Sequence, residues 1–124
     1  MKIYNDKTLS LINEIKREQV VSCINVVSKY KFVKRLIVFG SSVTDYCTEE
    51  SDIDLCIDME GSTIGMHTFY LDTDLCKACN YNCDILTYHK LSGRIKEEID
   101  NKGIVVYNIL QQAAVSNKEE ILRG

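Results

Sequence analysis

Two acidic residues, two positions apart, stand at the start of an apolar run in the middle of the chain. Asp52 and Asp54 open the segment 52–59, whose other members are mostly apolar. Because successive side chains of a β-strand point to opposite faces, the two carboxylates would share one face and Ile53 would take the other. Carboxylate oxygens are ligands that Mg²⁺ prefers. The spacing therefore predicts a divalent-metal site at the end of a strand.

A Gly-Ser pair closes the preceding apolar run. Gly40 and Ser41 follow the segment 36–39, and ten residues separate Ser41 from Asp52. Glycine has no Cβ, so a turn of this kind lets backbone N–H groups come close to a phosphate. Together with the paired acids, this turn predicts a site for a metal-bound nucleoside triphosphate (NTP).

The pattern G-S-x10-D-x-D resembles the signature of the nucleotidyltransferase superfamily that includes DNA polymerase beta. The chain is most similar to the minimal nucleotidyltransferase (MNT) domains of prokaryotes, which are often encoded beside a HEPN-domain protein as a toxin–antitoxin pair. The resemblance covers roughly residues 30–110. It implies an α/β (α+β) fold, with a small mixed sheet flanked by helices, as in polymerase beta-like nucleotidyltransferases.

The resemblance also assigns roles to individual residues. A third carboxylate lies in this family on the strand that follows the helix after the D-x-D strand, and Asp84 matches that place. Asp52 and Asp54 would hold two Mg²⁺ ions. Asp84 would hold the catalytic ion and help to deprotonate the acceptor hydroxyl. Two such ions can clamp the attacking and leaving oxygens of an in-line displacement.

The Gly-Ser turn is expected to contact the β and γ phosphates through Gly40 and Ser41, with Ser42 as a further donor. The loop that follows departs from the pattern of many relatives, which read G-S-x-A-x-G and carry arginines there. Here the segment 42–45 holds neither a basic residue nor a glycine. The triphosphate charge would then be met by metal, by a basic residue from elsewhere such as Lys77, or by a partner.

The composition is that of a single globular domain spanning residues 1–124. Of the residues, 45% are hydrophobic and 27% are charged, and the net charge is −3. An acidic balance argues against a large non-specific nucleic-acid surface. There is no apolar run near the roughly 18 residues of a membrane span, and the N-terminus lacks the apolar core of a signal peptide. We expect a cytoplasmic protein without direct membrane or nucleic-acid binding.

Three of the six cysteines are closely spaced, in the order Cys76-x2-Cys79-x3-Cys83. This spacing raises the alternative of a zinc site. A structural zinc usually takes four ligands, commonly supplied by two knuckles, and the second knuckle is missing here. The pattern favours reduced thiols used as small hydrophobic side chains.

Helices and strands are expected to alternate along the chain. The periodicity of the apolar residues predicts helices over 8–30, 63–80, 91–101 and 108–122, and strands over 35–39, 52–59, 81–88 and 104–107. Gly103 is a good stop for the third helix.

The leading hypothesis is transfer of a nucleoside monophosphate, AMP from ATP, to a hydroxyl of a HEPN-type toxin, which would make this chain the antitoxin. Two alternatives stay open. One is a modifier of small molecules that resembles aminoglycoside nucleotidyltransferases, and the other is an antitoxin that neutralises by binding alone. The apolar stripe of the terminal helix could bind the partner, self-associate into a homo-oligomer, or pack on its own core.

Overall fold

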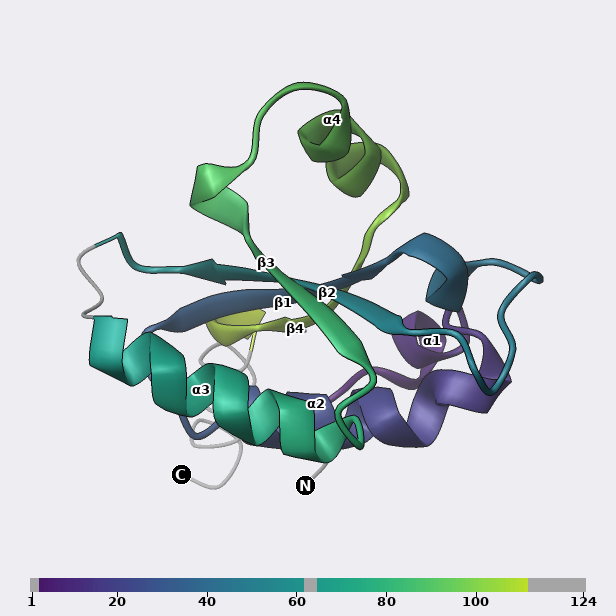
Figure 1. Ribbon diagram of the computed structural model, residues 1–124, viewed down its shortest axis with the longest axis horizontal. Coiled ribbons are helices and arrows are strands. Elements are labelled where there is room, and N and C mark those ends of the chain that lie inside the picture. Colours follow the sequence, from purple (N-terminus) through teal and green to yellow (C-terminus); the bar gives the residue numbers. More distant parts are fainter. Residues whose placement is uncertain (1–2, 62–64, 112–124) are drawn as a thin grey trace, which may run out of the picture.

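The computed structural model describes residues 3–61 and 65–111, and its centre is a four-stranded mixed sheet. The strands lie in the order β3-β2-β1-β4 (Figure 1). β1 pairs antiparallel with both β2 and β4, whereas β2 and β3 run parallel. This mixed sheet confirms the predicted fold class. The bounds are Val33–Phe39 for β1, Ile53–Met59 for β2, Cys83–Thr87 for β3 and Ile104–Asn108 for β4.

Helices cover both faces of the sheet. Figure 1 shows α2 (Arg17–Val27) and α3 (Gly65–Ala78) below the sheet and α4 (Gly93–Lys102) above it. The parallel pairing of β2 and β3 requires a crossover, and α3 supplies it. The shorter elements are α1 (Asp6–Leu9) and three 3₁₀ helices, η1 (Glu14–Lys16), η2 (Gly40–Val43) and η3 (Tyr88–Lys90).

The main core lies between the sheet and the α2–α3 pair. Alternate residues of β2, namely Ile53, Leu55 and Ile57, are fully buried there. They pack in one cluster with Leu71 and Leu75 of α3. The period-two pattern predicted that Ile53 lies on the face opposite the carboxylates, and the same alternation applies to the other two residues.

The opposite face of the sheet carries a smaller apolar cluster under α4. It joins Ile37 and Phe39 of β1 to Cys56 of β2 and Ile99 of α4. Polar residues share this face, and Arg35 pairs with Asp58 at 2.8 Å. Asp54 belongs to the same alternate set of β2 as Cys56 and Asp58, so it lies on this thinly covered face.

The predicted helix over 8–30 is wrong in its first half. The chain forms α1, then leaves helical geometry, and α2 begins only at Arg17. Asn13 explains the break, because its side chain accepts a hydrogen bond from Ile15 N–H and caps η1. Asn and Asp favour such local caps over helix interiors.

The other predicted elements before residue 108 exist, with ends shifted by a few residues. β1 begins two residues earlier than predicted, and β3 begins and ends inside its predicted span. Most of the predicted terminal helix over 108–122 lies outside the described residues. None of the helices in the described part has the length and apolar content needed to cross a bilayer.

Candidate active site

The parallel pairing of β2 and β3 places two of the predicted acids side by side. Asp54 and Asp84 are register partners in neighbouring strands. Paired residues of a parallel ladder point to the same face, so both carboxylates lie on the face that α4 only partly covers. Asp54 is half-buried and Asp84 is exposed. The fold thus brings together residues that lie thirty positions apart in the chain.

Gly40 lies directly beside Asp54. Phe39 ends β1 as the register partner of Asp54, and Gly40 then turns the chain with φ +71° into η2. A Cβ at Gly40 would lie 2.1 Å from Oδ2 of Asp54. Only glycine fits this position, for its positive φ and for the lack of space. The turn and the carboxylate therefore form one compact unit.

Asp52 is exposed and stands just before β2, at the end of the loop 44–52. Asn82 holds the backbone on both sides of it. The Asn82 side chain donates to the Ser51 carbonyl at 3.1 Å, and the Asn82 carbonyl accepts from Ile53 N–H at 3.0 Å. Asn82 thus ties the Asp52 segment to the start of β3, two residues before Asp84. The sequence analysis missed this positioning residue.

The electrostatics of the site centre on Asp54. Burial, followed by repulsion from Asp84 and Asp52, raises the pKa of Asp54 above its usual value of 3.8. Glu98 of α4 adds to the same shift. Glu98 is exposed on α4, and no local spacing in the sequence shows that α4 crosses the face that carries Asp54. The site thus concentrates negative charge around a half-buried carboxylate.

The two serines of the turn differ in exposure. Ser41 is half-buried, and its carbonyl accepts from both the N–H and the hydroxyl of Thr44, at 3.0 and 2.7 Å. Ser42 is fully buried, and its carbonyl accepts from Asn13 N–H at 2.7 Å. The burial of Ser42 favours Gly40 and Ser41 for contact with a phosphate. A donor role for Ser42 stays a prediction.

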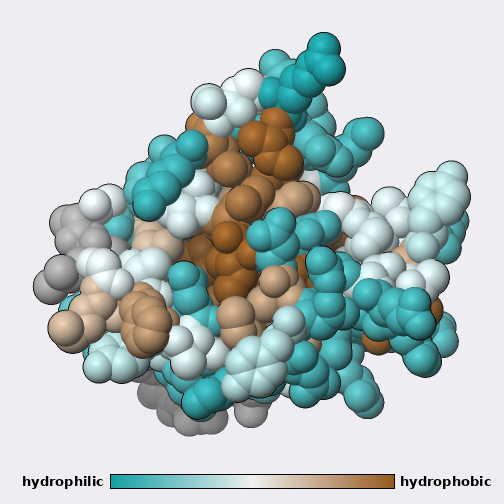
Figure 2. Space-filling view, viewed as in Figure 1, coloured by the Kyte–Doolittle hydropathy of each residue, from teal (hydrophilic) through white to brown (hydrophobic). Residues whose placement is uncertain are grey.

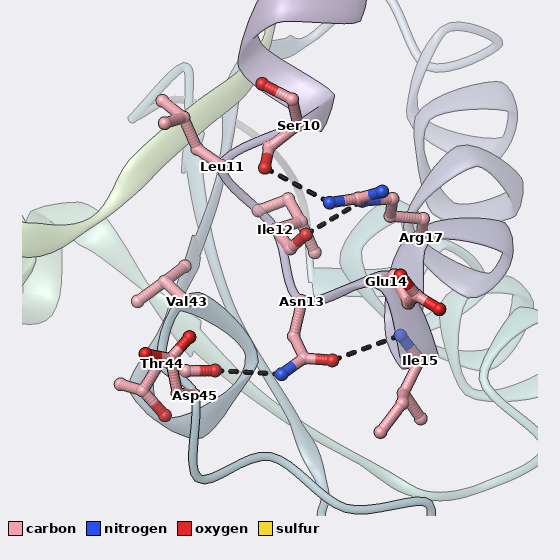
Figure 3. Close-up of a pocket in the computed structure, with 10 residues that line it drawn as sticks. All are labelled: Ser10, Leu11, Ile12, Asn13, Glu14, Ile15, Arg17, Val43, Thr44 and Asp45. Atoms are coloured by element: carbon pink, nitrogen blue, oxygen red, sulfur yellow. Dashed lines mark hydrogen bonds between the residues drawn. The ribbon is translucent and has the colours of Figure 1, made fainter.

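A cavity of about 450 Å³ lies behind this turn, between the segment 10–17 and the loop 43–45 (Figure 3). Asn13 bridges its two sides by donating to the Thr44 carbonyl at 2.9 Å. Arg17 lines the same cavity and donates to the carbonyls of Ile12 and Ser10. Arg17 is therefore a basic side chain that lines the same cavity as the loop 43–45, which has no basic residue of its own. Lys77, the basic residue that the sequence offered for the triphosphate charge, lines a hollow on the outer side of α2 and α3, across the sheet from Asp54.

The chemistry of the donor set fits a divalent cation. The site offers carboxylate oxygens from the neighbouring strands β2 and β3, and Mg²⁺ prefers such ligands. As the side chains stand, no group of three or more His, Cys, Asp or Glu residues within 3–61 and 65–111 is arranged to hold a metal ion. Metal ligation by Asp52, Asp54 and Asp84 therefore stays a proposal.

A family model described as "Polymerase beta, Nucleotidyltransferase" matches residues 21–112, which include both strands of the acids and the Gly-Ser turn. The chain belongs to this nucleotidyltransferase family. In line with the family, a protein of Methanocaldococcus jannaschii named "Putative protein adenylyltransferase MJ0435" is 32% identical over 96 residues, which are 77% of this chain and 97% of the relative. The general reaction, transfer of a nucleotidyl group, follows from the family.

Solved structures share the fold of this nucleotidyltransferase. A structure described as a toxin–antitoxin with AMP-PNP covers 85% of this chain and 94% of its own, with a TM-score of 0.57 and 13% identity. A tri-AMPylated Shewanella oneidensis HEPN toxin in complex with MNT antitoxin covers 78% of each chain, with a TM-score of 0.52 and 15% identity. At these identities the likeness is one of fold.

Proposed function

We propose that this nucleotidyltransferase moves AMP from Mg²⁺-ATP to a hydroxyl group of a HEPN-type partner protein. The observation that carries the proposal is the pairing of Asp54 with Asp84 across parallel strands, with Gly40 packed against Asp54. The name of the M. jannaschii relative supports AMP as the transferred group. The Shewanella complex, which holds an AMPylated toxin with its MNT antitoxin, supports the partner.

The three acids divide two tasks in the proposed reaction, metal binding and proton transfer. Asp52 and Asp54 would hold Mg²⁺, which would supply charge neutralisation at the phosphates and at the attacking and leaving oxygens. Asp84 is exposed at the edge strand, where an acceptor hydroxyl can reach it. Asp84 would take the proton of that hydroxyl as its oxygen attacks the α-phosphorus and pyrophosphate leaves.

The turn 40–43 would position the triphosphate. Gly40 lets the backbone approach Asp54 without a side chain between them, which would bring the N–H groups of the turn close to the proposed metal ligand. The half-buried Ser41 stands next in the chain. These features bind and orient the nucleotide, which is the main contribution a protein makes to this class of reaction.

The surface next to Asp84 supports a protein as the acceptor. β3 is an edge strand, and Figure 2 shows apolar side chains along the front of the molecule where β3 runs. Ile85 and Leu86 of β3 are only partly buried, and Ile95 of α4 is exposed. An apolar strip beside a catalytic carboxylate would favour a macromolecular acceptor over a small polar one.

The test is incubation of the full chain with labelled ATP, Mg²⁺ and a HEPN-domain protein of the same genome, followed by intact mass of both proteins. We expect one or more AMP units on the HEPN protein, and none with Asp84→Asn. Asp58→Asn is the matched control, because Asp58 lies on the same face of the sheet but pairs with Arg35.

The other outcomes separate the alternatives. Tight association of the two proteins without added mass would overturn the enzymatic proposal in favour of an antitoxin that acts by binding. Transfer of AMP to an aminoglycoside, with none to the HEPN protein, would support the small-molecule modifier. Equal labelling by Asp84→Asn and the unaltered chain would remove Asp84 from the mechanism.

A further inference from the structure

Four cysteines meet on the side of the sheet opposite the acids, where α2, α3 and the start of β3 come together. Cys23 comes from α2, Cys76 from α3, Cys79 from the turn directly after α3, and Cys83 from β3. The sulfur atoms of Cys23 and Cys79 are 3.2 Å apart, and those of Cys76 and Cys83 are 3.7 Å apart. Cys23, which stands far away in sequence, is the member that sequence spacing could not include.

A strained turn brings Cys83 back against Cys76. Asn80 and Tyr81 both have positive φ, +53° and +62°, and they are the only described residues other than glycine that do. Hydrogen bonds close the turn, from Tyr81 N–H to the Cys76 carbonyl at 2.7 Å and from Asn82 N–H to the Cys79 carbonyl at 3.0 Å. A left-handed backbone is costly for a bulky residue, so the rest of the fold must impose this turn.

The four thiols form an inner and an outer pair. Cys23 and Cys79 are fully buried, whereas Cys76 and Cys83 are partly exposed. All four are free thiols, and no three of them are arranged as a metal site within the described residues. A metal would need the sulfur atoms at the corners of a tetrahedron, whereas pairs of adjacent sulfurs suit disulfide formation.

We propose that Cys76 and Cys83 are an oxidant-responsive dithiol that closes to a disulfide on reaction with a peroxide or a low-molecular-weight disulfide. With a disulfide RSSR, the Cys76 thiolate attacks one sulfur and expels RS⁻, which takes up a proton. Cys83 then loses its proton, attacks the Cys76 sulfur and expels the second RS⁻. The two cysteines lose two electrons and two protons, and RSSR becomes two RSH. With hydrogen peroxide, the Cys76 thiolate takes one oxygen as a sulfenic acid and one water leaves after uptake of a proton, and Cys83 then attacks the Cys76 sulfur and releases the second water.

The geometry suits Cys83 to resolve the mixed disulfide, because its sulfur atom lies 3.7 Å from that of Cys76. Disulfides of intracellular proteins are mostly of this transient, sensing kind.

The bond would act on the proposed active site through one peptide unit. Cys83 pairs with Ile53, and the next residue, Asp84, pairs with Asp54. A disulfide has sulfur atoms about 2.05 Å apart, so closing the present gap of 3.7 Å draws the start of β3 toward α3. Asp84 then moves relative to Asp54. Oxidation is therefore expected to lower nucleotidyl transfer, an effect that rests on the proposed function.

The first test maps the bond itself. The reduced full chain is exposed to oxidised glutathione or hydrogen peroxide, then alkylated, digested without reductant and analysed by mass spectrometry. We expect a peptide link between Cys76 and Cys83 that dithiothreitol removes, and in Cys83→Ser a stable glutathione adduct on Cys76. Cys47→Ser is the matched control and should form the link normally. A link confined to Cys23 and Cys79, no link at all, or one zinc ion per chain that protects the thiols would overturn the proposal.

The second test measures transfer to the acceptor by the reduced and oxidised chain. We expect at least a several-fold loss on oxidation that dithiothreitol reverses, and no loss in Cys76→Ser/Cys83→Ser. A mapped disulfide with unchanged transfer would overturn the effect on Asp84. Absence of transfer in both forms would count against the proposed function instead. The mass-spectrometric map of the link between Cys76 and Cys83 would still test the dithiol proposal.

Discussion

The two faces of the sheet carry different titratable groups. On the face under α4, Asp54 is a half-buried carboxylate whose pKa is raised by burial, followed by repulsion from Asp84 and Asp52. On the face under α2 and α3, cysteine thiols pack in the core, where the hydrogen bond with the Cys23 thiol, followed by burial, raises the pKa of Cys79.

The two clusters differ in the free energy that their burial costs. Thiols are small and weakly polar, so they pack as core side chains while neutral. A half-buried carboxylate with other acids nearby is costly to ionise unless a cation balances its charge. The acidic cluster therefore suits a charged ligand. The thiol cluster stabilises the layer beneath, and the two meet at Cys83 and Asp84, adjacent residues on opposite faces of β3.

The largest expected effect is the loss of activity in Asp54→Asn. We expect transfer to fall roughly 10²–10³-fold, as when one charge-stabilising group is removed from an active site. In metal-free buffer the melting temperature should stay the same or rise, because the repulsion among the acids is relieved. Labelled-ATP transfer and thermal unfolding measure the two effects. Undiminished transfer beside a normal Asp58→Asn control would contradict the role of Asp54.

Leu55→Ala changes the neighbouring residue of the same strand, which points to the other face. Leu55 is fully buried in the main core, so we expect a loss of about 2–5 kcal/mol in the free energy of unfolding. Denaturant titration with unchanged slope would measure this loss. A stability change as small as that of Asp54→Asn would show that the two faces do not differ as described.

Gly40→Ala should reduce both stability and transfer. The left-handed backbone alone costs an alanine roughly 1–2 kcal/mol, and the new Cβ would also press on the Asp54 carboxylate. Gly93→Ala is the matched control, since Gly93 has φ +64° but open space around it. Gly93→Ala should therefore lose stability through backbone strain but keep its transfer activity. Equal transfer by the two variants would remove Gly40 from the site.

The smallest expected effect is a gain in stability from Tyr81→Gly. Tyr81 is exposed and has φ +62°, so glycine removes a strained backbone position at the cost of a freer unfolded chain. We expect a net gain of up to about 1 kcal/mol by denaturant unfolding. A clear loss instead would show that the Tyr81 side chain contributes more to the fold than its exposure suggests.

The sequence alone determined the strands of the site and the faces of their side chains. The two-residue period of 52–59 correctly divided β2 into a buried set and a set that carries Asp54, because the pleat of a strand leaves no other arrangement. The likeness to polymerase beta-like nucleotidyltransferases was confirmed by the family match. The spacing of apolar residues did not predict the helix break at Asn13. The break depends on a hydrogen bond from Ile15 N–H to the Asn13 side chain, and apolar spacing carries no information about such caps.

Tertiary structure decided which distant residues meet. Asn82 brackets Asp52, the charge of Glu98 reaches Asp54, and the Cys23 sulfur lies against that of Cys79. None of these relations follows from local spacing. The crossing of α4 over the sheet and the left-handed turn at Asn80 and Tyr81 are set by packing against the whole core. Hydrophobic periodicity and sequence motifs describe a few neighbouring residues. Contacts between distant residues depend instead on how complete helices and strands pack together.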